Sequence, residues 1–159
     1  MGTGKSTLGR LLARQLNYKF IDTDSEIEKR SGKTVADIFR EDGEAAFRQQ
    51  EKELVEELAQ KQGLVISTGG GLVMNPQNVQ NLRKSGEIVC LTASPDEILE
   101  RVSKQPETRP LLKEAEPLEK IRELLQQRSS TYAQFRQLPT SGQSPDELTT
   151  RLLEMLQFV

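Results

Sequence analysis

The chain opens on a glycine-rich segment that runs directly into an amphipathic helix, and no other feature limits its fold as strongly. Residues 2–7 read Gly-Thr-Gly-Lys-Ser-Thr, and leucines at helical spacing follow, which predicts a helix from about Lys5 to Gln15. Glycines let consecutive amides turn toward an anion at a helix N-terminus, where the helix dipole also favours negative charge. The segment therefore matches the second half of the phosphate-binding motif G-x-x-x-x-G-K-S/T.

This phosphate loop, residues 2–7, assigns a chemical role to its side chains. Lys5 supplies a mobile positive charge for the transferred phosphoryl group, and the Ser6 hydroxyl is placed to bind Mg²⁺. The residues expected to contact the nucleotide phosphates are Gly2, Thr3, Gly4, Lys5, Ser6 and Thr7. A flexible glycine-rich start without a ligand is the weaker interpretation, because Gly-Lys-Ser-Thr at the start of an amphipathic helix is a specific pattern.

The first residue, Met1, falls inside the loop, since the first glycine of the motif and the strand that should precede it are missing. In a doubly wound fold that strand lies in the middle of the sheet, and its absence would expose strand edges. We therefore expect a truncated form or a misassigned start codon. An apolar, β-branched strand ending in glycine is predicted just upstream.

The rest of the chain alternates short apolar strands with helices. Strands are predicted at 18–22, 64–68, 87–91 and 135–140. Helices are predicted at 25–60 with breaks near Gly32 and Gly43, after Pro76, from Ser94 to Lys104, after Pro117 and after Pro145. This order predicts an α/β fold, the three-layer P-loop NTPase fold, with a parallel sheet, helices on both faces and the first strand missing. Residues 1–159 should form one domain, and 105–116, which has little periodicity, is a candidate lid.

The amino-acid composition excludes several kinds of partner and of metal site. The net charge of -2 gives no general attraction for nucleic acid, and no apolar stretch approaches the roughly 20 residues of a membrane span. Histidine is absent and Cys90 is the single cysteine, so a structural zinc site is excluded and a reduced, cytoplasmic setting is expected. Catalysis must rely on carboxylates, lysine, arginine and Mg²⁺.

Two further motifs follow predicted strands, where ligands of open α/β sheets bind. Asp22 and Asp24 in Asp-Thr-Asp could hold Mg²⁺ through water and take a substrate hydroxyl. The alternative is a helix start, with Thr23 or Asp24 capping a helix that begins at Ser25. The glycine turn, Gly69-Gly70-Gly71, leaves backbone that a ligand can approach closely, although a plain tight turn would also use glycine.

Five segments, FIDTD, ADIFREDGEAAFR, STGGG, TRPLL and QRSSTY, resemble shikimate kinases in order and approximate spacing over nearly the whole chain. The resemblance implies that Asp22 helps to hold Mg²⁺ and that Asp24, a catalytic residue, binds the hydroxyl that is phosphorylated. It implies further contacts to the shikimate carboxylate and ring, from Arg48, Arg128 and Gly70. A helical shikimate-binding segment at about 25–62 is implied as well.

The resemblance also places two arginines near the nucleotide. Arg109, the lid arginine, should reach the transferring phosphoryl and act in catalysis, and Arg101 should lie against the adenine of ATP. The spacing from Arg101 to Arg109 is one residue longer than the family pattern, and the segment after Phe135 yields no adenine contact.

The implied activity is MgATP-dependent phosphorylation of the shikimate 3-hydroxyl, in the pathway to chorismate and the aromatic amino acids. The expected partners are ATP and shikimate, and the expected state is a monomer. Two alternatives stay open: a related kinase acting on gluconate or a nucleoside monophosphate, and a non-catalytic nucleotide-binding module.

Overall fold

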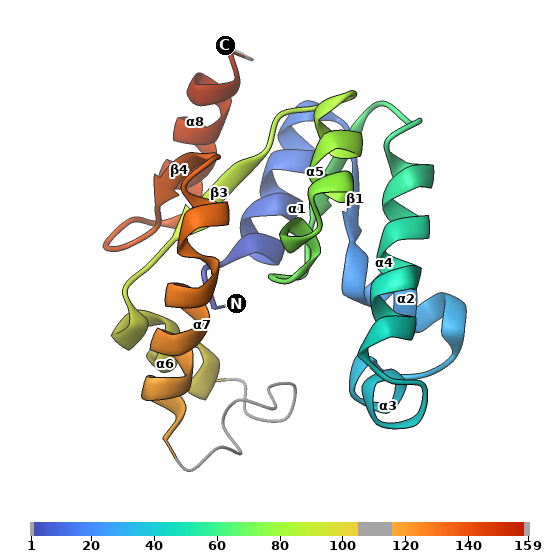
Figure 1. Ribbon diagram of the computed structural model, residues 1–159. Helices are drawn as coiled ribbons and strands as arrows, with labels where there is room; N and C mark the ends of the chain where they lie inside the picture. The colour runs from blue at the N-terminus through green and yellow to red at the C-terminus, as the bar shows by residue number, and fades with distance from the viewer. Residues whose placement is uncertain (1, 105–115, 158–159) are drawn as a thin grey trace. The chain divides into compact units, whose positions relative to one another are not determined.

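The computed structural model describes residues 2–104 and 116–157 (Figure 1). Nearly all of the candidate lid, including Arg109, lies outside the described residues. The chain divides into two compact units: residues 9–88 form one, and residues 1–8 with 89–159 form the other. The first boundary falls inside helix α1 (Lys5–Leu16).

The unit of residues 9–88 contains two parallel strands joined through three helices. Strand β1 (Lys19–Asp22) pairs with β2 (Leu64–Ser67), and Asp22 stands opposite Ser67 at the end of the register. The connecting helices are α2 (Thr23–Ser31), α3 (Val35–Glu41) and α4 (Glu44–Leu58). After β2, the chain forms a one-turn 3-10 helix η1 (Leu72–Met74) and helix α5 (Pro76–Arg83). Parallel pairing requires such crossovers, so the predicted strand and helix order is confirmed.

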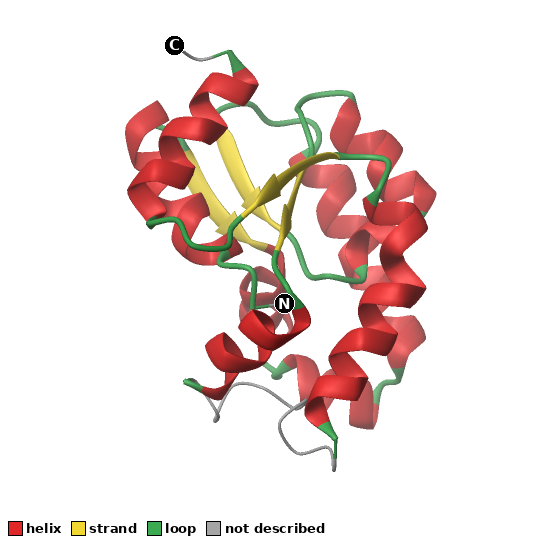
Figure 2. Cartoon of the chain, turned by 90° about the vertical axis from the view of Figure 1, so that its left-hand side faces the viewer, coloured by secondary structure: helices red, strands yellow, loops and turns green. Residues whose placement is uncertain are grey.

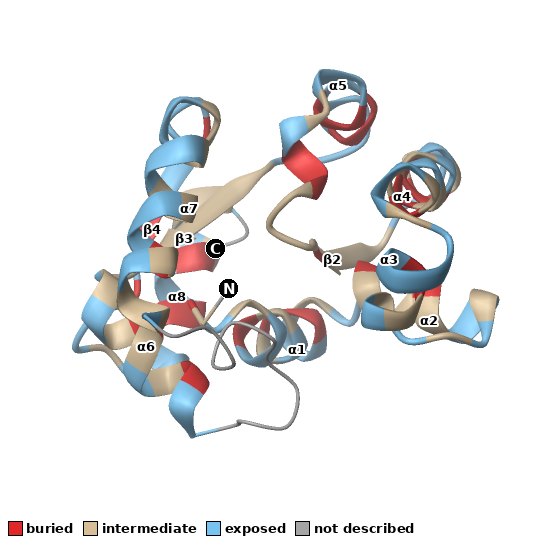
Figure 3. Ribbon diagram, turned by 60° about the horizontal axis from the view of Figure 1, so that its bottom comes forward, coloured by how far each residue is buried: buried red, intermediate tan, exposed pale blue. Residues whose placement is uncertain are grey.

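A shared apolar core holds these helices. Its buried members are Ile27, Ile38, Phe47, Leu54 and Leu58, with Ile21, Val35, Leu64 and Ile66 packed against them. Figure 3 shows buried positions along α4 among exposed and intermediate ones, as expected for an amphipathic helix with one face on the core. The predicted breaks are also present, since Gly32 ends α2 with φ 70° and Gly43 precedes α4 with φ 87°.

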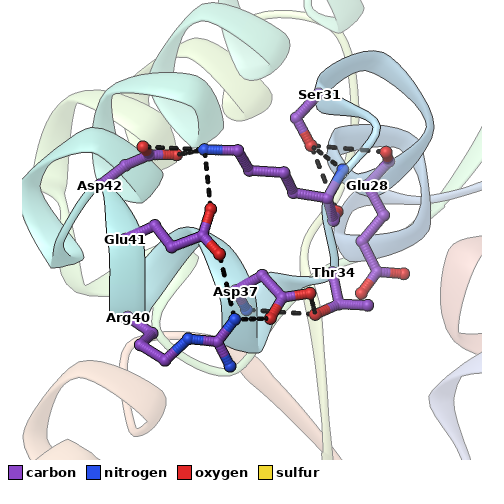
Figure 4. A network of polar contacts seen from close by, with 8 residues as sticks. Glu28, Ser31, Thr34, Asp37, Arg40, Glu41 and Asp42 are labelled. Atoms are coloured by element: carbon purple, nitrogen blue, oxygen red, sulfur yellow. Dashed lines mark hydrogen bonds and ion pairs between the residues drawn. The ribbon is translucent and has the colours of Figure 1, made fainter.

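Short helix α3 is held at both ends by charged side chains. The network in Figure 4 includes Glu28, Ser31, Thr34, Asp37, Arg40, Glu41 and Asp42. At one end Glu28 Oε1 accepts from Val35 N at 2.9 Å, and at the other Lys33 Nζ donates to both Asp42 oxygens at 2.8 and 2.9 Å. Lys33 and Asp42 are partly exposed, so solvent screens their ion pair and it contributes little to stability.

The second unit repeats the parallel-pair arrangement. Strand β3 (Val89–Thr92) pairs with β4 (Arg136–Pro139). Its helices are α6 (Pro95–Ser103), α7 (Pro117–Tyr132) and α8 (Pro145–Leu156). Ser94 and Ser144 form capping boxes at the starts of α6 and α8, as the Ser-Pro-Asp pattern predicts for the first of them.

The strands of both units are short and joined by helices (Figure 2). The α/β class with parallel strands is confirmed, and in the described chain the strands pair two by two. None of the helices within 2–104 and 116–157 combines the length and apolarity needed to cross a membrane.

Candidate functional site

The phosphate loop has the backbone that the motif predicts. Gly2 and Gly4 adopt φ 63° and 87°, a region that favours glycine, and α1 starts immediately afterwards at Lys5. The first turn of α1 contains no acidic residue. The positive end of the helix dipole at this N-terminus therefore favours an anion, with no carboxylate in the first turn to oppose it.

The start of the loop rests on helix α6. A Cβ added at Gly2 would lie 3.0 Å from Ile98 Cγ2 and 3.1 Å from Val102 Cγ1, so a larger residue would press against α6. Arg101, on the same helix, donates from Nη1 to Gly2 O at 3.4 Å. Helix α6 thus fixes the phosphate loop by both packing and a hydrogen bond.

Arg101 also binds the chain just after β4. Its Nη1 donates to Thr140 Oγ1 at 2.9 Å, and its Nη2 donates to Thr140 O at 3.2 Å. These bonds use the edge of the guanidinium group, whereas stacking on a base uses its flat face. The predicted contact of Arg101 with adenine is compatible with this arrangement and stays a prediction.

At the end of β1, the structure corrects the predicted helix start. Helix α2 begins at Thr23, not at Ser25, and the capping residue is Asp22, whose Oδ1 accepts from Ser25 N at 3.3 Å. Neither Thr23 nor Asp24 is the cap. The helix begins two residues before the expected start, so Asp24 stands in the first turn of α2.

The glycine turn gives space to two of the predicted site residues. A Cβ added at Gly69 would lie 2.6 Å from Asp24 Oδ1, and one added at Gly71 would lie 2.6 Å from Arg48 Nη1 and 2.7 Å from Arg48 Nη2. Real Cβ atoms do not approach so closely. The turn therefore brings Asp24 and Arg48 against bare backbone on either side of Gly70.

Arg48 is held by two carboxylates of its own helix. Glu44 Oε1 accepts from Nε at 3.1 Å and from Nη2 at 2.9 Å, and Glu51 Oε2 accepts from Nη1 at 2.7 Å. The guanidinium carbon also lies 5.5 Å from the centre of the Phe47 ring and 5.9 Å from that of Phe39. Burial works to lower the pKa of Arg48, but the hydrogen bonds to the two glutamates outweigh it and raise the pKa above its usual value.

Glu51 was not predicted as a site residue. It is 1% exposed, and among the described residues its Oε1 has no hydrogen-bond partner. Burial raises the pKa of Glu51, and the hydrogen bond to Arg48 opposes that shift. The sequence contained a signal: Glu51 occupies the position four residues after Phe47 on the buried face of α4, where an apolar side chain is expected.

The remaining predicted residues lie in the other unit or outside the description. Lys5, Ser6 and Arg101 share the unit of residues 1–8 and 89–159 with Arg128, a half-buried residue of α7. Arg109 lies outside the described residues. The structure thus assembles Asp24, Arg48 and the glycine turn in one unit, and the phosphate loop and Arg101 in the other.

Oxygen donors suited to Mg²⁺ are available at the predicted positions. Mg²⁺ is usually held by one or two protein oxygens together with substrate phosphates and water, and Ser6 and Asp22 supply a hydroxyl and a carboxylate. Within the described part of the chain, no cluster of three or more acidic, histidine or cysteine side chains could hold a metal ion. A hydroxyl and a carboxylate are oxygen donors of the kind that Mg²⁺ accepts, and the roles of Ser6 and Asp22 toward an ion that arrives with the nucleotide stay predictions.

Comparison with known proteins identifies the family to which the chain belongs. The family model "Shikimate kinase" matches residues 1–157. A shikimate kinase from Pelotomaculum thermopropionicum is 46% identical over 158 residues, which cover 99% of this chain and 91% of the relative. The solved shikimate kinase from Acinetobacter baumannii in complex with shikimate has a TM-score of 0.91 at 34% identity, covering 99% of this chain and 89% of that one.

A gluconokinase from Sinorhizobium meliloti 1021 is more distant. It has a TM-score of 0.56 at 20% identity and covers 99% of this chain and 91% of that chain, which shows a shared fold only. The family assignment rests on two findings. One family model matches almost every residue, and the identity to the relative from Pelotomaculum thermopropionicum extends over nearly its whole length. The chain belongs to the shikimate kinase family.

Proposed function

We propose that this chain transfers the γ-phosphoryl group of ATP to the 3-hydroxyl of shikimate, with Asp24 and Arg48 holding the acceptor. The observation that carries the proposal is the assembly of a carboxylate and a guanidinium group on the two sides of one glycine turn. Shikimate offers a carboxylate and ring hydroxyls, which suit an arginine and an aspartate respectively.

Arg48 retains hydrogen-bonding capacity for a ligand carboxylate. A guanidinium group has five N–H donors. The bonds to Glu44 and Glu51 use three of them, which leaves one on Nη1 and one on Nη2 within the described structure. A pair of parallel N–H groups matches the two oxygens of a carboxylate, so we propose that Arg48 grips shikimate in this way, with Arg128 as a second contact and Gly70 at the ring.

Asp24 is proposed to act on the hydroxyl that attacks. A carboxylate next to the acceptor oxygen orients its proton and can accept that proton late in the transfer. Lys5 and the amides of the phosphate loop would neutralise charge on the phosphoryl oxygens. The same role is proposed for Arg109 on the resemblance alone, and Arg101 is proposed to contact the adenine.

Bound with ATP, Mg²⁺ would supply charge neutralisation and orientation of the phosphates. Ser6 would hold it directly and Asp22 through water. Position and charge neutralisation together provide most of the rate in such transfers, because the protein performs little covalent chemistry.

The setting of the enzyme is also a proposal. We expect a cytoplasmic monomer whose partners are ATP and shikimate, with no nucleic-acid or membrane partner. The net charge of -2 supports only the last of these expectations, since it provides no general attraction for polyanions.

An acceptor assay tests the proposal. ADP release would be measured with shikimate, gluconate and AMP offered separately to the protein. Release that depends on shikimate is expected, and release with gluconate or AMP only would reject the proposed acceptor. As a matched variant, Asp24→Asn should lose turnover about 100-fold or more while ATP binding persists. Full turnover in that variant would remove Asp24 from its role.

A further inference from the structure

Thr23, the residue between the two aspartates, is fully buried and is bonded to the glycine turn. It is the first residue of α2 and is 0% exposed. Its Oγ1 accepts a hydrogen bond from Gly69 N at 3.1 Å, between residues 46 positions apart in the sequence. The last paired residues of β1 and β2 are Asp22 and Ser67. The hydroxyl of Thr23 therefore extends the contact between the two strands one step beyond their backbone pairing.

A second buried polar side chain holds the other end of the turn. Asn78 of α5 is 1% exposed, and its Nδ2 donates to Leu72 O at 3.0 Å. Leu72 N donates to Gly69 O at 3.2 Å, so the turn closes between its two attachments. Asn78 Oδ1 has no partner among the described residues, which makes its burial unfavourable for stability. The hydrogen bond from Nδ2 offsets this cost by holding the turn in place.

The Thr23 bond fixes the turn relative to Asp24, because Thr23 and Asp24 are adjacent in the first turn of α2. Gly69 lies so close to Asp24 that an added Cβ would be 2.6 Å from Oδ1. A small shift of the turn would change the gap between the Asp24 carboxylate and the backbone of Gly70. The bond thus acts on the separation of two groups that the proposed function places around one ligand.

We infer that Thr23 is a positioning residue for the phosphoryl acceptor, and that its hydroxyl holds the glycine turn at the distance from Asp24 that shikimate requires. The inference rests on the proposed function. Thr23 need not touch shikimate, since it acts through Gly69 and through the adjacent Asp24.

Thr23→Val tests this directly, because valine keeps the shape of threonine and removes the hydroxyl. The Gly69 N–H then loses the hydrogen bond to Oγ1, the one acceptor it has among the described residues, and the turn is free to shift. We expect the KM for shikimate to rise about tenfold, the change that follows from losing one buried hydrogen bond. The KM for ATP should be unchanged. Thr23→Ser, which retains the hydroxyl, should restore the KM for shikimate.

Thr149→Val is the matched control. Thr149 is also 0% exposed, and its Oγ1 donates to the backbone oxygen of Pro145 at 2.7 Å, in α8. It lies in the unit of residues 1–8 and 89–159, away from the glycine turn in sequence and outside the proposed acceptor residues. This control should lower the melting temperature without changing the KM for shikimate.

Three results would overturn the inference about Thr23. An unchanged KM for shikimate in a folded Thr23→Val protein would overturn the inference and leave the proposed function standing. If Thr23→Val does not fold, Thr23→Ser and Thr23→Ala replace it, since they differ only in the hydroxyl; equal KM values in that pair would overturn the inference. A wild-type protein that does not turn over shikimate at all would overturn both the inference and the proposed function.

Discussion

The phosphate loop and the glycine turn are both rich in glycine, yet they need it for different physical reasons. Gly4 in the phosphate loop has φ 87°, and no heavy atom of the described residues lies within 4 Å of an added Cβ. Gly71 in the glycine turn has an ordinary φ of -89°, but an added Cβ would lie 2.6 Å from Arg48 Nη1. Gly4 is needed for its backbone conformation and Gly71 is needed for space, whereas Gly2 combines a positive φ with close packing against α6.

The difference decides how a substitution should act. At Gly4, a side chain strains the backbone that presents amides to the nucleotide, so the substitution should weaken the binding of ATP. At Gly69 or Gly71, a side chain displaces Asp24 or Arg48, so the substitution should impair the binding or turnover of shikimate. Identical glycine-to-alanine changes can therefore separate the two subsites.

Gly69→Ala should give the largest effect. The new Cβ would force the Asp24 carboxylate away from the acceptor hydroxyl, because the two would otherwise be 2.6 Å apart. Turnover with shikimate should fall about 100-fold, the range for loss of a positioned acid–base group, while nucleotide affinity is retained. Steady-state kinetics with each substrate varied in turn would check this. Unchanged turnover would show that Asp24 does not need its present position.

Gly71→Ala should mainly raise the KM for shikimate. Its Cβ meets the far end of a flexible arginine, so the guanidinium group can move aside and the fold should persist. Loss of charged hydrogen bonds to the ligand carboxylate corresponds to an increase of about 10- to 100-fold in KM. Thermal unfolding serves as the control. A large drop in melting temperature with a normal KM would contradict the space argument.

Gly4→Ala should raise the KM for ATP and leave the affinity for shikimate unchanged. An alanine at a positive φ costs about 1–2 kcal/mol, and the loop would relax away from the geometry that binds phosphate. We expect the KM for ATP to rise about five- to thirtyfold, which that free energy allows. Shikimate affinity measured without nucleotide should stay unchanged, and a parallel loss of shikimate affinity would refute the division of roles.

Glu57→Gln, on the exposed side of α4, should change neither subsite and only slightly affect stability. Hydrogen bonds from Arg30, then from Lys61, lower the pKa of Glu57 to about 2. A lowered pKa stabilises the folded protein above the unfolded value of about 4.3, and this contribution is lost as the pH falls toward 2. The difference in melting temperature between wild type and variant should thus shrink between about pH 5 and pH 3. A difference that grows in acid would contradict the assignment.

Local patterns predicted most of the fold, because the signals lie within a few residues of each element. Gly32 and Gly43 marked the helix breaks, and Ser94 marked the start of α6. The start of α2 was wrong by two residues. Asp22, Thr23 and Asp24 can all cap a helix, and which one does so depends on where β1 stops pairing with β2.

The candidate site was predicted less completely, since its details depend on residues distant in sequence. The contact of Gly70 with the shikimate ring stays a prediction, and the sequence did not indicate that the missing side chains of Gly69 and Gly71 accommodate Asp24 and Arg48. Which glycine needs space depends on side chains more than 20 positions away. Glu51 could have been predicted from the sequence, because a carboxylate on the apolar face of α4 is an exception to the helical pattern.

Direct binding of shikimate in the absence of nucleotide tests the central claim, that Arg48 beside the glycine turn holds the acceptor carboxylate. Calorimetric titration would compare the wild type with Arg48→Lys, which keeps the charge but loses the paired N–H groups, and gluconate would serve as the control ligand. The account predicts that the wild type binds shikimate in preference to gluconate and that Arg48→Lys weakens this binding by about tenfold or more. Equal affinity of the two proteins for shikimate would contradict it.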